Sequence, residues 1–140
     1  MITQHDIEIL SGGMSDERME AEINHMIYLV GQEIAYSNGL LSQYHPKTKD
    51  GQKIYPASLA DISQAKQNWD RRVWKMLSEL FNGQEADVRV RFDMTKGSPA
   101  EFEYDQIWNE IHDKQNVLGD FRDDLEAILR KLSQLKQRNF

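Results

Sequence analysis

A seven-residue repeat of apolar side chains near the C-terminus constrains the fold of this chain more than any other feature. One row of the repeat is Ile111, Leu118, Leu125 and Leu132, and a second row is Phe121, Ile128 and Leu135. Apolar residues at this spacing face one side of an α-helix and are typical of helices that pack as in a coiled coil. The repeat therefore predicts helix over residues 99–137, with its apolar stripe buried against another helix.

The middle of this segment contains residues that do not favour a helix. Lys114 and Gln115 are polar, and Gly119 costs roughly 1 kcal/mol relative to alanine in a helix interior. One bent helix and two successive helices with a break near residues 113–119 are therefore both possible. The start is better defined, since Ser98-Pro99-Ala100-Glu101 combines a capping serine, a proline at the first helical position and a glutamate at the third.

Apolar residues at spacings of three and four predict another helix over residues 15–42. Ser15 is a suitable capping residue, and Asp16 and Glu17 lie in the first turn, where the helix dipole favours anions. Ser37-Asn38-Gly39 is a weak point at which this helix either ends or bends.

A third helix is predicted over residues 59–82. Ser58 and Asp61 form a capping pair at its start. Gly83 follows its end, at the position where a left-handed backbone commonly stops a helix.

Two short segments permit more than one structure. In residues 2–12, the alternation from Asp6 to Ile9 favours a strand, whereas Thr3 and Asp6 form a capping pair that favours a helix. Residues 44–57 contain the turn signal Asp50-Gly51 and form either a small hairpin or a loop.

Residues 87–93, DVRVRFD, alternate as a β-strand does. Val88, Val90 and Phe92 would face one side of this strand, and Arg89 and Arg91 would face the other. The sequence therefore predicts one short strand in a chain that is otherwise mainly helical.

A strand of this length needs a partner. The candidates are residues 6–10 of the same chain, residues 52–55 of the same chain, and a copy of the strand in a second subunit. Pairing within the chain is favoured, and with residues 6–10 it would place Asp6 and Glu8 opposite Arg89 and Arg91.

These elements predict a mainly α fold: a bundle of three to five helices with a minimal β element of one to three short strands. The length of 140 residues favours a single domain over residues 1–140. A compact chain of this size buries roughly 68–70% of its unfolded surface, so it needs no disulfide or metal to be stable.

The composition bounds the function. There is no cysteine, which excludes disulfides, thiolate nucleophiles and cysteine-type zinc sites. No apolar run is long enough to span a membrane, and the N-terminus lacks the features of a signal peptide, so we expect a soluble, cytoplasmic protein. The net charge of −6 disfavours nucleic acid as a direct ligand of the surface as a whole.

The segment around Trp74 is the first candidate site. Trp74 points away from the apolar face of its helix and lies near Arg71, Arg72 and Lys75. Tryptophan and arginine dominate the energetics of protein interfaces, and an aromatic ring among cations can also stack on a nucleobase. Burial of Trp74 under another helix, with the arginines paired to acidic residues, is the purely structural alternative.

An acidic stretch is the second candidate site. Residues 98–127 carry a net charge of −7, and carboxylates spaced along a helix can imitate a phosphate backbone. A charge run on a helix is more often a solvated face. The residues of this candidate mimic face are Glu101, Asp105, Asp120, Asp123 and Asp124.

Catalytic and metal sites are not indicated. Glu22 and His25 have the spacing of two metal ligands on one helix turn, but no second such pair occurs in the chain. We therefore expect no catalytic residue, metal or cofactor.

The sequence favours a non-enzymatic protein-interaction or regulatory protein that is a homodimer and binds another protein. The alternative is a small acidic inhibitor, in the style of phage proteins that counter host defence, that mimics nucleic acid and blocks a basic nucleic-acid-binding protein. Direct binding of nucleic acid through the Trp74 region and Lys47, Lys49 and Lys53 ranks below both.

Overall fold

The structure is a computed structural model, and it describes residues 3, 6–7, 9, 16–97 and 103–138. The elements follow the order α2 (Asp16–Gln43), β1 (Lys47–Lys49), β2 (Gln52–Ile54), α3 (Leu59–Leu80), α4 (Asp87–Met94) and α5 (Glu103–Arg138). The prediction of a mainly helical bundle with a minimal β element is confirmed. None of the described helices is long and apolar enough to cross a membrane.

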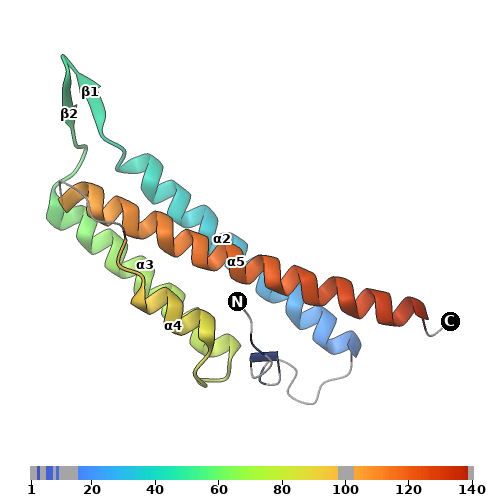
Figure 1. The fold of residues 1–140 in the computed structure, drawn as a ribbon. Coiled ribbons are helices and arrows are strands. Elements are labelled where there is room, and N and C mark those ends of the chain that lie inside the picture. Colours follow the sequence, from blue (N-terminus) through green and yellow to red (C-terminus); the bar gives the residue numbers. More distant parts are fainter. Residues whose placement is uncertain (1–2, 4–5, 8, 10–15, 98–102, 139–140) are drawn as a thin grey trace.

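The long helices α2 and α5 run antiparallel, side by side (Figure 1). α3 lies along the first half of α5, and α4 returns beside α3 in the opposite direction (Figure 1). The C-terminal part of α5 extends past α3 and α4, beside the beginning of α2. More helices therefore lie side by side at the hairpin end of the bundle than at the C-terminal end of α5.

The core lies where α2, α3, α4 and α5 meet. The ring of Trp69 packs edge-on against Phe92, with centroids 5.5 Å apart, and Phe81 lies 6.0 Å from Phe121. In the seven-residue repeat, Leu118 and Leu125 are fully buried against this core. Towards the end of α5, the last apolar residues of the stripe whose burial the structure describes are only partly buried; they are Ile128, Leu129 and Leu132.

α5 is one continuous helix, so the possible break near residues 113–119 does not occur. The polar residues that suggested a break are used for contacts with other helices. Lys114 Nζ donates to the carbonyl oxygen of Phe92 at 2.7 Å, and Gln115 Nε2 donates to Ser37 Oγ at 2.7 Å and to Asn38 Oδ1 at 2.8 Å. α2 likewise continues through residues 37–39 to its end at Gln43.

The predicted ends of α3 are close to those observed. Ser58 Oγ accepts a hydrogen bond from the backbone N–H of Asp61 at 3.2 Å, which confirms the capping pair. The helix ends at Leu80, and Gly83 follows with a φ of 74° and donates its N–H to Ser78 O at 2.7 Å. Gly83 thus has the expected left-handed backbone.

The prediction of a strand over residues 87–93 is wrong, because these residues form α4. Val88 and Phe92 lie one turn apart on this helix and are both buried. There is therefore no strand to pair with residues 6–10, with residues 52–55 or with a second subunit. Arg89 and Arg91 do not face acidic residues across a sheet: Arg89 lies over the ring of Trp74, and Arg91 pairs with Asp120.

Groups distant in the sequence explain why α4 is helical. An eight-residue helix is marginal alone, and the capping position is occupied by Ala86, which makes no side-chain cap. The buried carboxylate of Asp6 accepts from the backbone N–H of Asp87 at 3.4 Å, and the ammonium of Lys114 donates to Phe92 O at the other end. An anion at the start and a cation at the end complement the helix dipole.

The described residues of the N-terminal segment support the helical alternative, since Asp6, Ile7 and Ile9 are helical. Thr3 N–H donates to Asp6 Oδ2 at 3.3 Å, and Asp6 N–H donates to Thr3 Oγ1 at 3.1 Å. These reciprocal bonds confirm the capping pair of Thr3 and Asp6. The predicted helix starts at Ser15 and at residues 98–101 lie outside the described residues.

Of the two structures predicted for residues 44–57, a small hairpin or a loop, the hairpin is observed. β1 and β2 are antiparallel, with Thr48 opposite Lys53, and the two-residue turn consists of Asp50 and Gly51 at φ values of 54° and 78°. Positive φ at both positions is the requirement of the type I′ turn, which the Asp-Gly signal favours. The hairpin projects from the end of the bundle, and all residues of its two strands are exposed (Figure 1).

Candidate functional site

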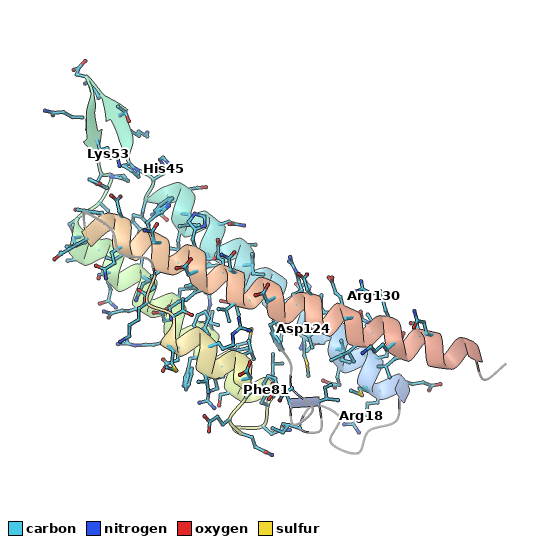
Figure 2. All side chains as sticks on the ribbon, in the orientation of Figure 1. Arg18, His45, Lys53, Phe81, Asp124 and Arg130 are labelled. Carbon is cyan, nitrogen blue, oxygen red and sulfur yellow. The ribbon has the colours of Figure 1, made fainter. Side chains whose placement is uncertain are left out.

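A pocket of about 220 Å³ lies where the hairpin meets the end of α2 and the beginning of α5. Figure 2 shows His45 and Lys53, which both line it, near the base of the hairpin. Its lining includes the aromatic rings of Tyr44, His45, Tyr55, Tyr104 and Trp108. Among the residues that the structure describes, Asp105 is its one acidic residue. We refer to it as the aromatic pocket.

Three separate segments supply these side chains. Tyr44 and His45 directly follow α2, and Tyr55 directly follows β2. Tyr104 and Trp108 are one turn apart in the first turns of α5. The hairpin thus folds the chain back so that residues far apart in the sequence share one pocket.

The aromatic rings have defined mutual orientations. Tyr55 and Tyr104 stack with centroids 3.9 Å apart and planes within 17°. His45 and Trp108 meet edge to face, 5.3 Å apart and at 85°. The hydroxyl of Tyr104 donates to the carbonyl of Ala57 at 3.3 Å, which fixes the ring against the chain that leaves the hairpin. The aromatic pocket is therefore lined by one stacked pair of rings and one edge-to-face pair.

The aromatic pocket combines apolar ring faces with one half-buried carboxylate, that of Asp105. Ring faces carry partial negative charge and attract cations, while the ring planes also offer apolar contact area. The hairpin adds the exposed Lys53 to the lining, whereas the exposed Lys47 and Lys49 do not line the aromatic pocket. The arrangement is suited to binding a side chain or a small ligand.

The structure does not bring the predicted cluster around Trp74 into one site. Trp74 is half-buried, and the guanidinium of Arg89 lies 3.9 Å above its ring. Arg72 points to α2, where its Nε donates to Glu33 Oε2 at 3.0 Å and its guanidinium lies 3.8 Å from the ring of Tyr36.

Arg71 and Lys75, the other two cations of that cluster, are exposed on α3. The contacts of Trp74 with Arg89 and of Arg72 with Glu33 agree with the purely structural alternative for these two residues.

The candidate mimic face is divided. Asp120, Asp123 and Asp124 line a shallow hollow together with Arg91, whose Nη2 lies 3.8 Å from Asp120 Oδ2. Asp105 belongs to the aromatic pocket, and Figure 2 shows Asp124 far from His45 along the molecule. Glu101 lies outside the described residues.

A charged cluster that the sequence analysis missed joins α3 to α5. Lys66 contacts Asp70 on α3, at 3.2 Å, and Glu110 on α5. Lys114 Nζ lies 3.9 Å from Asp70 Oδ1, and its side chain is only 4% exposed. We refer to these four residues as the buried charge cluster. Its signal in the sequence is two pairs of opposite charge at a spacing of four, one on each helix.

The environment shifts three pKa values in this cluster. Burial raises the pKa of Asp70, and the positive charges of Lys114 and Lys66 oppose this only in part. Burial lowers the pKa of Lys114 against the opposing charges of Asp70 and Glu110. Burial also acts to lower the pKa of Lys66, but the hydrogen bond to Glu110 and the charge of Asp70 outweigh it and raise the pKa.

The buried charge cluster contains two cations and two carboxylates that neutralise one another, and Lys114 also serves α4 through Phe92 O. Its contacts hold α3, α4 and α5 together, which is a structural role. Among the described residues, no group of three or more His, Asp or Glu side chains could hold a metal ion.

Comparison of the chain with protein-family models gives no match, and comparisons with curated proteins and with solved structures give none either.

Proposed function

We propose that this chain is a non-enzymatic protein-interaction protein whose partner docks at the hairpin end of the bundle. The observation that carries the proposal is the aromatic pocket. Tyrosine and tryptophan give most of the binding energy at many interfaces, where they line or fill well-packed pockets. Ile54, at 49% exposure, adds apolar surface to the hairpin itself, although it does not line the aromatic pocket.

The size of the aromatic pocket favours a protein partner over a free metabolite. Pockets for drug-sized ligands have volumes of roughly 300–1,000 Å³. The aromatic pocket has about 220 Å³, which suits a single side chain that projects from a larger surface. The neighbouring hairpin would contact that surface.

The hairpin supplies a second mode of contact. In the described part of the chain β1 and β2 pair only with each other, so each has an outer edge with backbone groups available to a partner. Addition of an extended segment to such an edge is a common way in which proteins bind peptides. A partner strand on the hairpin could thus place one of its side chains in the aromatic pocket.

Site-specific crosslinking tests this proposal. A photoreactive amino acid replaces Lys53 at the hairpin, Arg71 on α3, or Lys131 near the end of α5. We expect a crosslinked partner from position 53 and none from position 131, and we expect Tyr55→Ala to abolish the product.

A product from position 71 instead of 53 would move the site to the predicted cluster of Trp74, Arg71, Arg72 and Lys75. In that case, Arg71→Ala should weaken capture without unfolding the chain. No product at either position would contradict the proposed function.

Self-association belongs to the same proposal. The strand that suggested a two-chain sheet does not exist, and most of the seven-residue repeat is buried within the chain. The remaining support is the end of α5 beyond α3 and α4, where Ile128, Leu129 and Leu132 are only partly buried. We propose that two copies pack at this end.

Imitation of nucleic acid is the second candidate function, and the continuity of α5 favours it. Asp105 and Asp123 are 18 positions apart, about five turns and 27 Å, so they lie in one line along α5, with Asp105 at the aromatic pocket and Asp123 at the hollow beside Arg91. Binding through such a face would weaken steeply with salt and with Asp123→Asn. A complex that persists unchanged at high salt would exclude this function.

A further inference from the structure

We infer that the aromatic pocket binds the cationic end of a lysine or arginine side chain of the partner protein. The juxtaposition that carries this inference is the half-buried carboxylate of Asp105 beside the rings of Trp108 and Tyr104. The inference rests on the proposed function, because it names the group that the docking surface recognises.

The ring geometry favours a cation. The planes of His45 and Trp108 are nearly perpendicular, at 85°, and the stacked Tyr55 and Tyr104 add another wall. The rings that line the aromatic pocket thus have different orientations, and ring faces attract compact positive groups, as in the aromatic cages that bind ammonium groups. Two parallel rings with a free slot between them would favour a flat base, but the parallel pair here is already in contact at 3.9 Å.

The charge of the lining also favours a cation. Asp105 is half-buried on α5, whereas Lys53, the basic residue of the lining, is exposed on the hairpin. Water and salt screen an exposed charge more strongly than a partly buried one. The field inside the aromatic pocket is therefore dominated by the carboxylate and the ring faces, and it attracts a positive group.

The same features disfavour an anionic occupant such as a nucleotide. Its base could contact Trp108 and its phosphate could approach Lys53, but the phosphate would also lie near Asp105. The volume of about 220 Å³ is small for base, sugar and phosphate together. A long basic side chain needs room only for its end group, since its stem can lie on apolar surface.

Titration followed by NMR tests the inference on the intact chain. The probes are N-acetyl-arginine amide and N-acetyl-lysine amide, with the neutral isosteres citrulline and norleucine in the same form, and AMP as the anionic probe. The readout is the indole N–H signal of Trp108, which Trp108→Phe distinguishes from those of Trp69 and Trp74. We expect the cationic probes to shift this signal saturably, with affinities about fivefold or more above those of their isosteres.

A matched pair of variants locates the charge that matters. Asp105→Asn should reduce the affinity for the arginine probe to that for citrulline. Glu103→Gln removes a carboxylate from the same first turn of α5 but from a residue that does not line the aromatic pocket, so it should leave the affinity unchanged.

Equal binding of the neutral isosteres, tighter binding of AMP, or no shift with any probe would each overturn the inference. These results would leave the crosslink at position 53 intact, so a failure here is distinguishable from a failure of the proposed function. If the crosslink at position 53 were absent but binding remained selective for cations, the aromatic pocket would bind free cations and not a side chain of a partner protein, which would also overturn the inference.

Discussion

The carboxylate of Asp6 accepts hydrogen bonds from the backbone N–H groups of Thr3 and Asp87, which start two different helical segments. It is 1% exposed, so neither bond competes with bulk water. One side chain thus provides the cap of its own segment and the cap that Ala86 cannot provide for α4.

Asp6→Ala should lower the free energy of unfolding by about 1–2 kcal/mol, the usual effect of losing a helix cap. Amide hydrogen exchange should accelerate in α4 as well as near Thr3, because both helix starts lose an acceptor. Urea denaturation and exchange measurements check this, with Asp123→Ala as the control at an exposed carboxylate. Loss of stability without faster exchange in α4 would contradict the role of Asp6 there.

The buried charge cluster gives a dependence of stability on pH. Because the pKa of Lys114 in the folded chain lies below its ordinary value of 10.5, the unfolded chain binds more protons between these two pKa values. The free energy of unfolding should therefore rise as the pH increases towards 10.5. Lys66 has a raised pKa, so its opposite contribution appears only above 10.5.

Asp70→Asn should steepen this rise. Burial lowers the pKa of Lys114, and the charge of Asp70 is the largest of those that oppose this, so its removal lets that pKa fall further. Urea denaturation at several pH values between about 8 and 10 should show the variant gaining more stability with pH than the unchanged chain. Parallel curves would show that Asp70 and Lys114 are not coupled.

At the scale of elements, α5 contains a glycine that its structure does not require. A Cβ added to Gly119 would meet nothing within 4 Å, apart from the helix itself and its chain neighbours. Gly97, just before α5, differs: its φ is 76°, and a Cβ there would lie 2.7 Å from the backbone nitrogen of Glu110. The chain crosses α5 at Gly97 more closely than any side chain permits.

Gly119→Ala should therefore raise the free energy of unfolding by about 0.5–1 kcal/mol. Gly97→Ala should lower it by about 1–3 kcal/mol through backbone strain and the contact with α5. Thermal and urea denaturation of the two variants compare the same chemical change at two sites. Equal effects would contradict the difference in their surroundings.

Elements governed by local signals could be predicted from the sequence. The capping pair at Ser58, the glycine after α3 and the Asp-Gly turn each act within a few residues, and the seven-residue repeat acts along a single helix. Each lies in the element that it predicted. α4 could not be predicted, because its alternation of apolar and polar residues favours a strand while its caps come from Asp6 and Lys114. Tertiary contacts outweigh the local pattern there.

The candidate site was less predictable for the same reason. Trp74 is half-buried on α3, and no local pattern indicates that Arg89 of α4 would cover its ring. The aromatic pocket depends on the hairpin, which brings Tyr55 to Tyr104. Asp105 and Lys53 of that pocket were among the candidates, and each was assigned to another surface.

At the scale of the whole molecule, the proposed dimer rests on the partly buried apolar residues near the end of α5, Ile128, Leu129 and Leu132. Size-exclusion chromatography with light scattering should give twice the chain mass of 16.4 kDa. Leu132→Asp should return the protein to the monomer, whereas Met94→Asp, at a residue on α4 that is 70% exposed, should not. A mass of 16.4 kDa for the unchanged chain would contradict self-association.

The two distant caps of α4 also bear on how the chain is made. Synthesis proceeds from the N-terminus, so Asp6 leaves the ribosome 81 residues before Asp87, and Lys114 follows Phe92 by 22 residues. A nascent α4 thus finds its anionic cap already present and its cationic cap still missing. Until the middle of α5 emerges, residues 87–93 lack their cationic cap. During that time their alternation of apolar and polar residues favours a β-strand, although these residues form a helix in the complete structure.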